Sequence, residues 1–254
     1  MTHSPFTKCP ILFEDTDVIV VNKLEGILSH PNPGSSHSAA AFEGPYDSGE
    51  RQFKTPQGPV WLIHRLDQDT SGVLLAVKNK KCAEACRRAF DERTVKKGYV
   101  ALVSRRPMPA QSLWRDSFME QRSGGAVRAA IDPYGRPNAF MNYKMKEFFP
   151  KLNLSLLEID LLTGKTHQIR VQSVYHGHPV AGDRVYGNFT LNRQLKPALG
   201  LDRMFLHAWR LALPHPVSGK PLVIECPLPD DLEECLSRCH GQRSKHNGKN
   251  NVAR

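Results

Sequence analysis

The sequence has no long apolar run. Nowhere in its 254 residues do about 20 consecutive apolar side chains occur, which is the length that a membrane-spanning helix needs. The first residues, Met1 to Cys9, contain neither the apolar core of a secretion signal nor an arginine-rich amphipathic presequence. We therefore expect no membrane partner and a cytoplasmic location.

Cysteines are few and irregularly spaced. There are six, too few at this length for a disulfide scaffold. The group Cys226, Cys235, Cys239 and His240 leaves a metal site open as an alternative, but it contains no paired C-x-x-C knuckle. We predict reduced, structural thiols and no metal.

A complete phosphate-binding loop is also missing. Gly164, Lys165 and Thr166 match the end of that pattern, but it requires a glycine five positions before Gly164, where Ile159 stands. This mismatch excludes nucleotide triphosphate binding by that motif, and we expect no nucleotide cofactor.

Acidic residues are outnumbered by basic ones. The chain has 35 Lys and Arg against 25 Asp and Glu, a formal charge of +10, which favours a polyanionic partner such as RNA. An anionic membrane is the rival partner, but no basic helix carries Trp or Phe on an apolar face. Hydrophobic content of 40% is enough for one large domain or two small ones.

The most informative stretch runs from His64 to Gly72. It is strongly polar and lies between the apolar runs 60–63 and 73–77, which predicts a strand, a loop and a second strand. A loop anchored at both ends can hold a reactive side chain rigidly, and this one offers Asp67 beside Arg65. The alternative is a surface ion pair next to a Thr-Ser-Gly turn.

The other predicted elements follow from hydrophobic periodicity. A helix is expected after Asn79, an N-cap residue, because apolar side chains recur at helical spacing up to Phe90. Residues 30–59 are rich in Gly, Ser and Pro and predict a long mobile loop. Residues 105–137 predict loops and short strands. Further strands are expected at 11–13, 18–21, 97–103, 142–146 and 152–162, with a hairpin at 210–225.

Three motifs resemble those of the RluA-like family of RNA pseudouridine synthases. They are His64-Arg65-Leu66-Asp67 followed by Thr70-Ser71-Gly72, Lys97-x-Tyr99-x-Ala101-Leu102-Val103, and Thr163-Gly164-Lys165-Thr166-His167-Gln168-Ile169-Arg170. Further matching segments at 177–187, 206–208 and 211–220 occur in the family's order. Three positions depart from the pattern: Leu24 replaces a Pro, Lys165 an Arg, and Gln172 a common His.

The resemblance implies an α+β fold, with a mixed, mostly antiparallel sheet, peripheral helices and two subdomains flanking a central basic cleft. We divide the chain into an N-terminal extension (1–10), a pseudouridine synthase catalytic domain (11–229) and a basic, disordered C-terminal tail (230–254). We expect no small N-terminal RNA-binding domain such as some relatives carry, because the catalytic pattern begins by residue 11.

The resemblance also assigns roles to residues. Asp67 is the catalytic carboxylate, Arg170 its cationic partner, and Tyr99 lies against the uracil and helps to remove its C5 proton. Arg65 fills the space left by a flipped uridine or holds the RNA backbone, although an ion pair with Asp69 is an alternative. Lys165, His167 and Gln168 complete the expected substrate-binding set. Isomerisation needs no redox change or group donor, so no cofactor is expected.

Two other functions remain open. A glycosidase could use Asp67 and Asp69 as its two carboxylates, but the basic charge would then be unexplained. A catalytically silent RNA-binding or ribosome-assembly factor could share the fold, but it would not need Asp67, Tyr99 and Arg170 together. For the enzyme we expect a monomer that modifies a uridine in a stem-loop of transfer or ribosomal RNA, and we favour transfer RNA.

Overall fold

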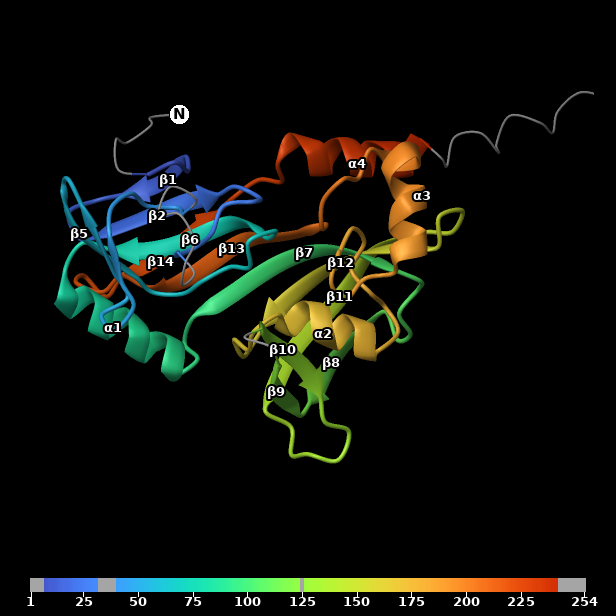
Figure 1. Cartoon of the computed structure of the whole chain (residues 1–254), viewed down its shortest axis with the longest axis horizontal. Coiled ribbons are helices and arrows are strands. Elements are labelled where there is room, and N and C mark those ends of the chain that lie inside the picture. The colour runs from blue at the N-terminus through green and yellow to red at the C-terminus, as the bar shows by residue number, and fades with distance from the viewer. Residues whose placement is uncertain (1–6, 32–39, 124–125, 242–254) are drawn as a thin grey trace, which may run out of the picture. The chain divides into compact units, whose positions relative to one another are not determined.

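The structure, a computed structural model, describes residues 7–31, 40–123 and 126–241. The described chain forms two compact units (Figure 1). The first comprises residues within Met1–Tyr99, Asp160–Thr163 and Leu206–Pro227, and the second residues within Val100–Ile159, Gly164–Phe205 and Leu228–Arg254. Each unit is built from segments that are far apart in the sequence.

The first unit is a sheet with one covering helix. Its elements are β1 (Ile11–Glu14), β2 (Val18–Lys23), β3 (Tyr46–Asp47), β4 (Gln52–Thr55), β5 (Gly58–Leu62), β6 (Ser71–Val77), α1 (Lys80–Asp91), the start of β7 (Lys96–Ser104), β13 (Leu206–Pro214) and β14 (Pro221–Glu225). The predicted strands at 11–13 and 18–21 and the hairpin near residues 210–225 are confirmed.

Strand β6 is the centre of this unit. All seven of its residues are buried. One edge pairs with β2 along six registered positions, from Val18 opposite Val77 to Lys23 opposite Gly72. The other edge is shared, since β5 pairs antiparallel with its C-terminal half and β13 pairs parallel with its first two residues. The polar loop of residues 63–70 leaves the sheet where these two partners meet.

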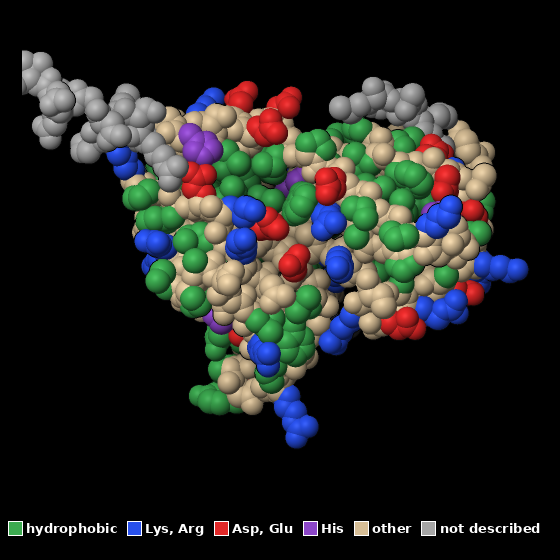
Figure 2. Space-filling view, turned by 180° about the vertical axis from the view of Figure 1, so that it is seen from behind, with side chains coloured by type: hydrophobic (Ala, Val, Ile, Leu, Met, Phe, Trp, Pro, Cys, Tyr) green, Lys and Arg blue, Asp and Glu red, His purple; other side chains and the backbone are tan. Residues whose placement is uncertain are grey.

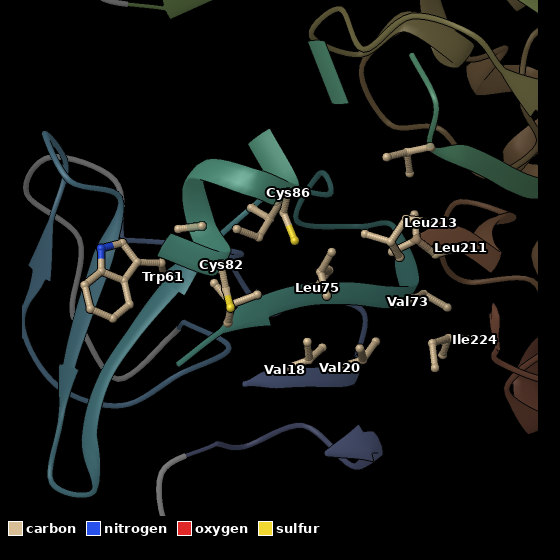
Figure 3. Packing of buried hydrophobic residues seen from close by; sticks show 14 of the residues in the cluster. Val18, Val20, Trp61, Val73, Leu75, Cys82, Cys86, Leu211, Leu213 and Ile224 are labelled. Atoms are coloured by element: carbon tan, nitrogen blue, oxygen red, sulfur yellow. The ribbon is translucent and has the colours of Figure 1, made fainter. Parts of the chain in front are cut away.

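Helix α1 begins where the sequence predicts. The side chain of Asn79 accepts a hydrogen bond from the backbone N–H of Cys82, as an N-cap residue does. Cys82 and Cys86, one turn apart, face the sheet and pack with β-branched and leucine side chains such as Val20 and Leu75 (Figure 3). Burial of these apolar groups fixes α1 on the sheet.

The second unit combines strands with three helices. Its elements are the rest of β7, β8 (Gln111–Asp116), β9 (Phe118–Ser123), β10 (Ala126–Ile131), β11 (Ala139–Phe149), β12 (Leu154–Leu161, which passes into the first unit after Ile159), α2 (Gln168–Tyr175), α3 (Phe189–Leu199) and α4 (Asp230–Gly241). Strands β9 and β10 form a separate two-stranded hairpin. Helices α3 and α4 share a core with the strand residues Leu102 and Leu154.

The predicted fold class is confirmed, since the sheet is mixed and mostly antiparallel and the described residues form four helices. Two regional predictions need correction. The 30–59 segment is not one loop, because β3, β4 and the start of β5 lie in it; residues 32–39 lie outside the described part. The 230–254 segment is not disordered throughout, because Asp230–Gly241 is helix α4. Residues 242–254 are not described.

Helix α4 forms because its apolar side chains share one face. Leu232, Cys235 and Cys239 are buried at helical spacing, and three acidic residues in the first turn favour the helix N-terminus. Both thiols are free and buried, which agrees with structural cysteines. No described helix is long and apolar enough to cross a membrane.

On at least one face of the protein, the basic side chains are not concentrated in a single area. On the face in Figure 2, Lys and Arg side chains lie among acidic and hydrophobic ones rather than in a single block. The net charge therefore does not by itself identify an RNA-binding surface there.

Gly72 gives a direct test of the sheet centre. Its φ is +117°, and a Cβ there would lie 2.2 Å from the carbonyl oxygen of Ala208 on β13. We expect Gly72→Ala to lower the free energy of unfolding by about 3 kcal/mol or more, from backbone strain and overpacking combined. Gly219→Ala is the matched control, because Gly219 also has a positive φ, +68°, but nothing within 4 Å of the added methyl group.

The control should lose only about 1–2 kcal/mol. Urea unfolding of both variants measures the difference, and equal losses would contradict the close approach of β6 and β13.

Candidate active site

The loop that carries Asp67 is anchored by a buried lysine. Lys23, at the end of β2, has no exposed surface, and its Nζ donates to the carbonyl oxygens of Leu24, Ile27 and Gln68 at 3.0, 2.6 and 2.9 Å. These three acceptors match the three N–H donors of an ammonium group. The residue directly after Asp67 is thereby fixed to the turn that follows β2.

A serine fixes the other side of Asp67. The hydroxyl of Ser29 accepts from the backbone N–H of Leu66 at 2.9 Å and donates to the carbonyl oxygen of the same residue at 2.9 Å. Both groups are buried, so an unmade bond would leave polar atoms without partners. The backbone before and after Asp67 is therefore held by side chains from the first 30 residues.

The end of the loop is held from β13. The Nε2 of His207 lies 3.1 Å from the carbonyl oxygen of Cys226, which can only accept, so this nitrogen carries the proton. The Nδ1 then accepts from the hydroxyl of Ser71 at 2.9 Å. His207 is completely buried. The Thr-Ser-Gly part of the motif thus links the start of β6 to β13.

The side chain of His64, the first residue of the motif, takes the place of a backbone hydrogen-bond acceptor beyond the end of strand β5. Beyond the end of β5, Ile63 still donates to the carbonyl oxygen of Leu75, and the Nε2 of His64 accepts from the N–H of Leu75 at 3.0 Å. Its ring also stacks on Phe90 of α1. Burial, with the nearby charge of Lys97, lowers the pKa of His64 to about 3. The ring is therefore neutral and structural.

Asp67 and Tyr99 share this unit, and the charge of Asp67 acts on Tyr99. Asp67 is half-buried in the loop, and Tyr99, on β7, is buried. Burial raises the pKa of Tyr99 far above its usual value, and the negative charge of Asp67 raises it further. The phenol thus stays protonated at neutral pH. This disfavours a phenolate that removes the C5 proton of the uracil. The expected contact of Tyr99 with the uracil ring is then the stronger of its two proposed roles.

The contact of Arg65 in the structure differs from the ion pair with Asp69 that the sequence suggested as an alternative. Its side chain is exposed, and Nη1 lies 3.5 Å from Nε2 of His30. The ion pair with Asp69 that we considered does not appear among the contacts of Arg65 in the described residues. Asp69 has interactions of its own in the structure.

The Thr163–Arg170 motif leads into α2, which begins at Gln168. All of the motif after Thr163 belongs to the second unit. His167 precedes the helix in the left-handed conformation, with a φ of +55°. Its Nδ1 lies 3.0 Å from the hydroxyl of Tyr186. The side-chain oxygen of Gln168 accepts from the backbone N–H of Lys165 at 3.0 Å, which holds the turn before the helix. Lys165 itself is exposed.

Arg170 is buried and bound to an aspartate that the sequence reasoning did not assign. Its Nε and Nη2 donate to the two carboxylate oxygens of Asp183 at 2.8 and 2.9 Å. The guanidinium also lies 5.0 Å from the ring centre of Tyr186. Burial alone would raise the pKa of Asp183, but Arg170 and two backbone N–H groups hold it below the usual value.

The departure at Gln172 has a structural partner. Its side-chain nitrogen donates to a carboxylate oxygen of Asp116 at 2.6 Å, and its oxygen accepts from Gln168 at 2.9 Å. Gln168 also donates to the carbonyl oxygen of Phe140. His176 lies 3.0 Å from the same oxygen of Asp116. A chain of buried polar groups therefore fixes the orientation of Gln168.

The structure thus places the predicted site residues in two groups. Arg65, Asp67 and Tyr99 belong to the first unit, and Lys165, His167, Gln168 and Arg170 to the second. The missed residues are Lys23, Ser29, Asp183 and His207. Asp183 and His207 lay inside segments that matched the family, which was the available signal. In the described residues, no three His, Cys, Asp or Glu side chains gather as a metal site would require.

Comparison with known proteins agrees with the motifs. A family model described as RNA pseudouridylate synthase matches residues 17–174. The chain is 36% identical over 231 residues to ribosomal large subunit pseudouridine synthase D of Nitrosomonas europaea, covering 89% of this chain and 64% of that protein. It is 33% identical over 235 residues to ribosomal large subunit pseudouridine synthase C of Escherichia coli, covering 92% and 70%.

A solved structure shows the same fold. The human protein RNA pseudouridylate synthase domain containing 1 matches with a TM-score of 0.67 and 25% sequence identity, covering 92% of this chain and 90% of that chain. The chain belongs to the RluA-like family of RNA pseudouridine synthases. Members of this family are isomerases. The chain nevertheless spans less than two thirds of the Nitrosomonas relative.

The anchoring groups converge on the first motif, and a loop without such support would not hold a side chain in one position. Lys23, Ser29, His64 and His207 supply the support in this member of the family.

His64 gives a pH-dependent prediction for this family member. Its pKa is about 3 in the folded protein and near 6.5 in the unfolded chain. Below pH 6.5 the unfolded chain binds a proton that the folded protein does not, so stability falls as pH drops toward 3. Between pH 7 and pH 5, His64 should account for a loss on the order of 1–2 kcal/mol.

His64→Gln should remove this contribution, because an amide oxygen can accept from Leu75 but does not titrate. Urea unfolding of both proteins at pH 7 and pH 5 measures the difference. An identical pH dependence in the variant would show that His64 is not held neutral.

Proposed function

We propose that this chain isomerises uridine to pseudouridine in RNA and that Asp67 is the catalytic carboxylate. The reaction breaks the N1–C1′ bond, forms a C5–C1′ bond, releases the C5 proton and leaves a proton on N1. It needs no oxidant or group donor, so we predict no nucleotide or metal cofactor. The observation that carries the proposal is the fixed loop: Asp67 follows Leu66 and precedes Gln68, and both neighbours are hydrogen-bonded to distant side chains.

Asp67 could act in two ways. An ionised carboxylate can attack C1′ as a nucleophile, or it can stabilise positive charge at the sugar while a proton is removed. Both require a group held within about 0.5 Å of its working position. The backbone bonds on either side of Asp67 supply that restraint in either mechanism.

Tyr99 and Arg170 take supporting roles in the proposal. Tyr99 is a buried, protonated phenol whose pKa is raised in part by Asp67, which suits packing against a base better than proton abstraction. Arg170 is proposed as the cationic partner of the catalytic carboxylate from the resemblance of its motif. The bidentate contact with Asp183 fixes the guanidinium plane.

The remaining motif residues are proposed to contact RNA. Arg65 and Lys165 are exposed cations, suited to phosphate oxygens. His167 and Gln168 are fixed by Tyr186 and by Lys165 and Gln172. As a Lys, residue 165 offers a point charge instead of the planar contact an Arg would make.

For the substrate we propose ribosomal large-subunit RNA, with the uridine in a stem-loop. The names of the relatives in Nitrosomonas europaea and Escherichia coli support this choice. They favour ribosomal over transfer RNA, contrary to the preference we drew from the sequence. The hairpin requirement rests on the need for bases that can be splayed out.

Asp67→Asn tests the proposal directly. The side chains are nearly isosteric, and the backbone carbonyl of Asp67 still accepts from Thr70, so folding and RNA affinity should change little. Release of tritium from RNA containing 5-³H-uridine should fall by roughly a thousandfold or more. Appreciable turnover by the purified variant would refute the assignment of Asp67.

Asp69→Asn is the discriminating companion. A glycosidase pair would make both carboxylates essential, whereas the proposed reaction keeps substantial tritium release in this variant. A catalytically silent RNA-binding protein would release no tritium even as wild type, while still binding RNA.

A further inference from the structure

Two aromatic rings lie close to the proposed catalytic loop. His30 follows the turn held by Lys23, and Tyr46 begins β3. Their ring centres are 5.1 Å apart with an angle of 10° between the planes, so the rings are stacked. Each residue is half-buried, so part of the stacked pair faces solvent.

Neighbouring side chains and a backbone carbonyl hold the stacked pair in place. Tyr46 packs on Phe53 with ring centres 4.7 Å apart, and Phe53 packs on Phe42 at 5.6 Å. Both phenylalanines are completely buried. The Nδ1 of His30 donates to the carbonyl oxygen of Pro31 at 3.0 Å, and Nε2 lies 3.5 Å from Nη1 of Arg65. The pair is therefore preorganised by the core.

Three arginines from separate segments act electrostatically on Tyr46. Arg51 follows β3, Arg65 precedes Asp67, and Arg87 comes from α1; each lies close enough for its charge to lower the pKa of Tyr46, although burial raises it more. Arg51 and Arg65 are exposed. Arg87 donates to the carbonyl oxygen of Glu50 at 2.8 Å. Unlike a carboxylate, that carbonyl does not neutralise its charge.

The two acidic side chains near Tyr46 and the arginines, Asp47 and Glu50, have partners of their own. The Oδ1 of Asp47 accepts from the backbone N–H groups of Gly49 and Glu50, which closes the turn after β3. The carboxylate of Glu50 pairs with Lys80 at 3.1 Å. Asp47 keeps its negative charge and raises the pKa of Tyr46, but the three arginines outnumber it. The local charge around the two rings is therefore positive, and a stacked aromatic pair beside exposed arginines matches the composition of single-stranded RNA sites.

We propose that His30 and Tyr46 stack an unpaired RNA base that neighbours the target uridine, while Arg51 and Arg65 bind the adjoining phosphates. The site rests on the proposed function for the identity of that neighbour. Arg65 is two residues before Asp67, and two residues of extended chain span about 7 Å. One nucleotide step from the reacting sugar therefore falls within reach of the His30–Tyr46 pair.

The binding test uses a fluorescein-labelled single-stranded RNA of 12 nucleotides containing uridine, and a blunt duplex of the same length. Fluorescence anisotropy should show that Tyr46→Ala and His30→Ala weaken binding of the single strand by roughly tenfold. Binding of the duplex, whose bases cannot reach the rings, should change less than twofold. Tyr46→Phe keeps the ring and should bind the single strand like wild type.

Charge and folding are controlled separately. Arg51→Gln should reduce the slope of log affinity against log salt by about one for the single strand. Tyr134→Ala removes an aromatic side chain that is 96% exposed in the second unit and should leave single-strand affinity unchanged. Thermal unfolding of each variant checks that loss of binding is not loss of fold, and the Tyr46→Phe protein shows whether the ring itself is required.

The possible results separate this site from the enzyme assignment. Wild-type affinity in both alanine variants, or equal losses for single strand and duplex, would overturn the stacking site. A ring-dependent preference for single strands supports it even if no tritium is released from RNA by the wild-type enzyme. In that case the proposed function fails and the binding site stands.

Discussion

The ammonium group of Lys23 is enclosed by three backbone carbonyls, one of them from the residue after Asp67. Removing a charge from water is costly unless its donors are all satisfied, so the turn after β2 and the Asp67 loop must keep their relative positions. Ser29, His64 and His207 add bonds to the same stretch. The loop has little strand pairing of its own, and its rigidity comes from these side chains. A carboxylate can then be held in place without being part of a strand.

In the second unit, too, a few side chains hold the residues of the motif in place. Arg170 is bound by both oxygens of Asp183, whose carboxylate also closes the following turn through Val185 and Tyr186. Gln168 is fixed by Gln172 and, through it, by Asp116. In both units the residues that match the family are held by residues without an assigned chemical role. Substitution of those supporting residues should therefore disturb geometry before it disturbs chemistry.

Sequence reasoning succeeded where local rules decide the structure. Asn79 caps α1, and the alternating and apolar runs around residues 18–21, 73–77 and 154–161 form strands, because side-chain periodicity and capping act over a few residues. The loop position of Asp67 followed from the same patterns. Helix α4 could have been predicted as well, since Leu232, Cys235 and Cys239 are at helical spacing after Pro229; the basic composition of the following residues concealed it.

The rest of the candidate site depended on distant pairing. Nothing in the sequence indicates that His64 accepts from Leu75, because that bond requires a register that only the folded sheet defines. The contact of Arg170 on α2 with Asp183 likewise depends on how the helix packs against a later turn.

We propose that the chain makes pseudouridine in ribosomal RNA. The most direct test of this proposal is carbodiimide treatment and primer extension on large-subunit RNA from cells lacking the gene, before and after incubation with the purified protein. We predict that a missing pseudouridine stop in a stem-loop returns on incubation; an unchanged pattern, with every stop already present in the mutant RNA, would contradict it.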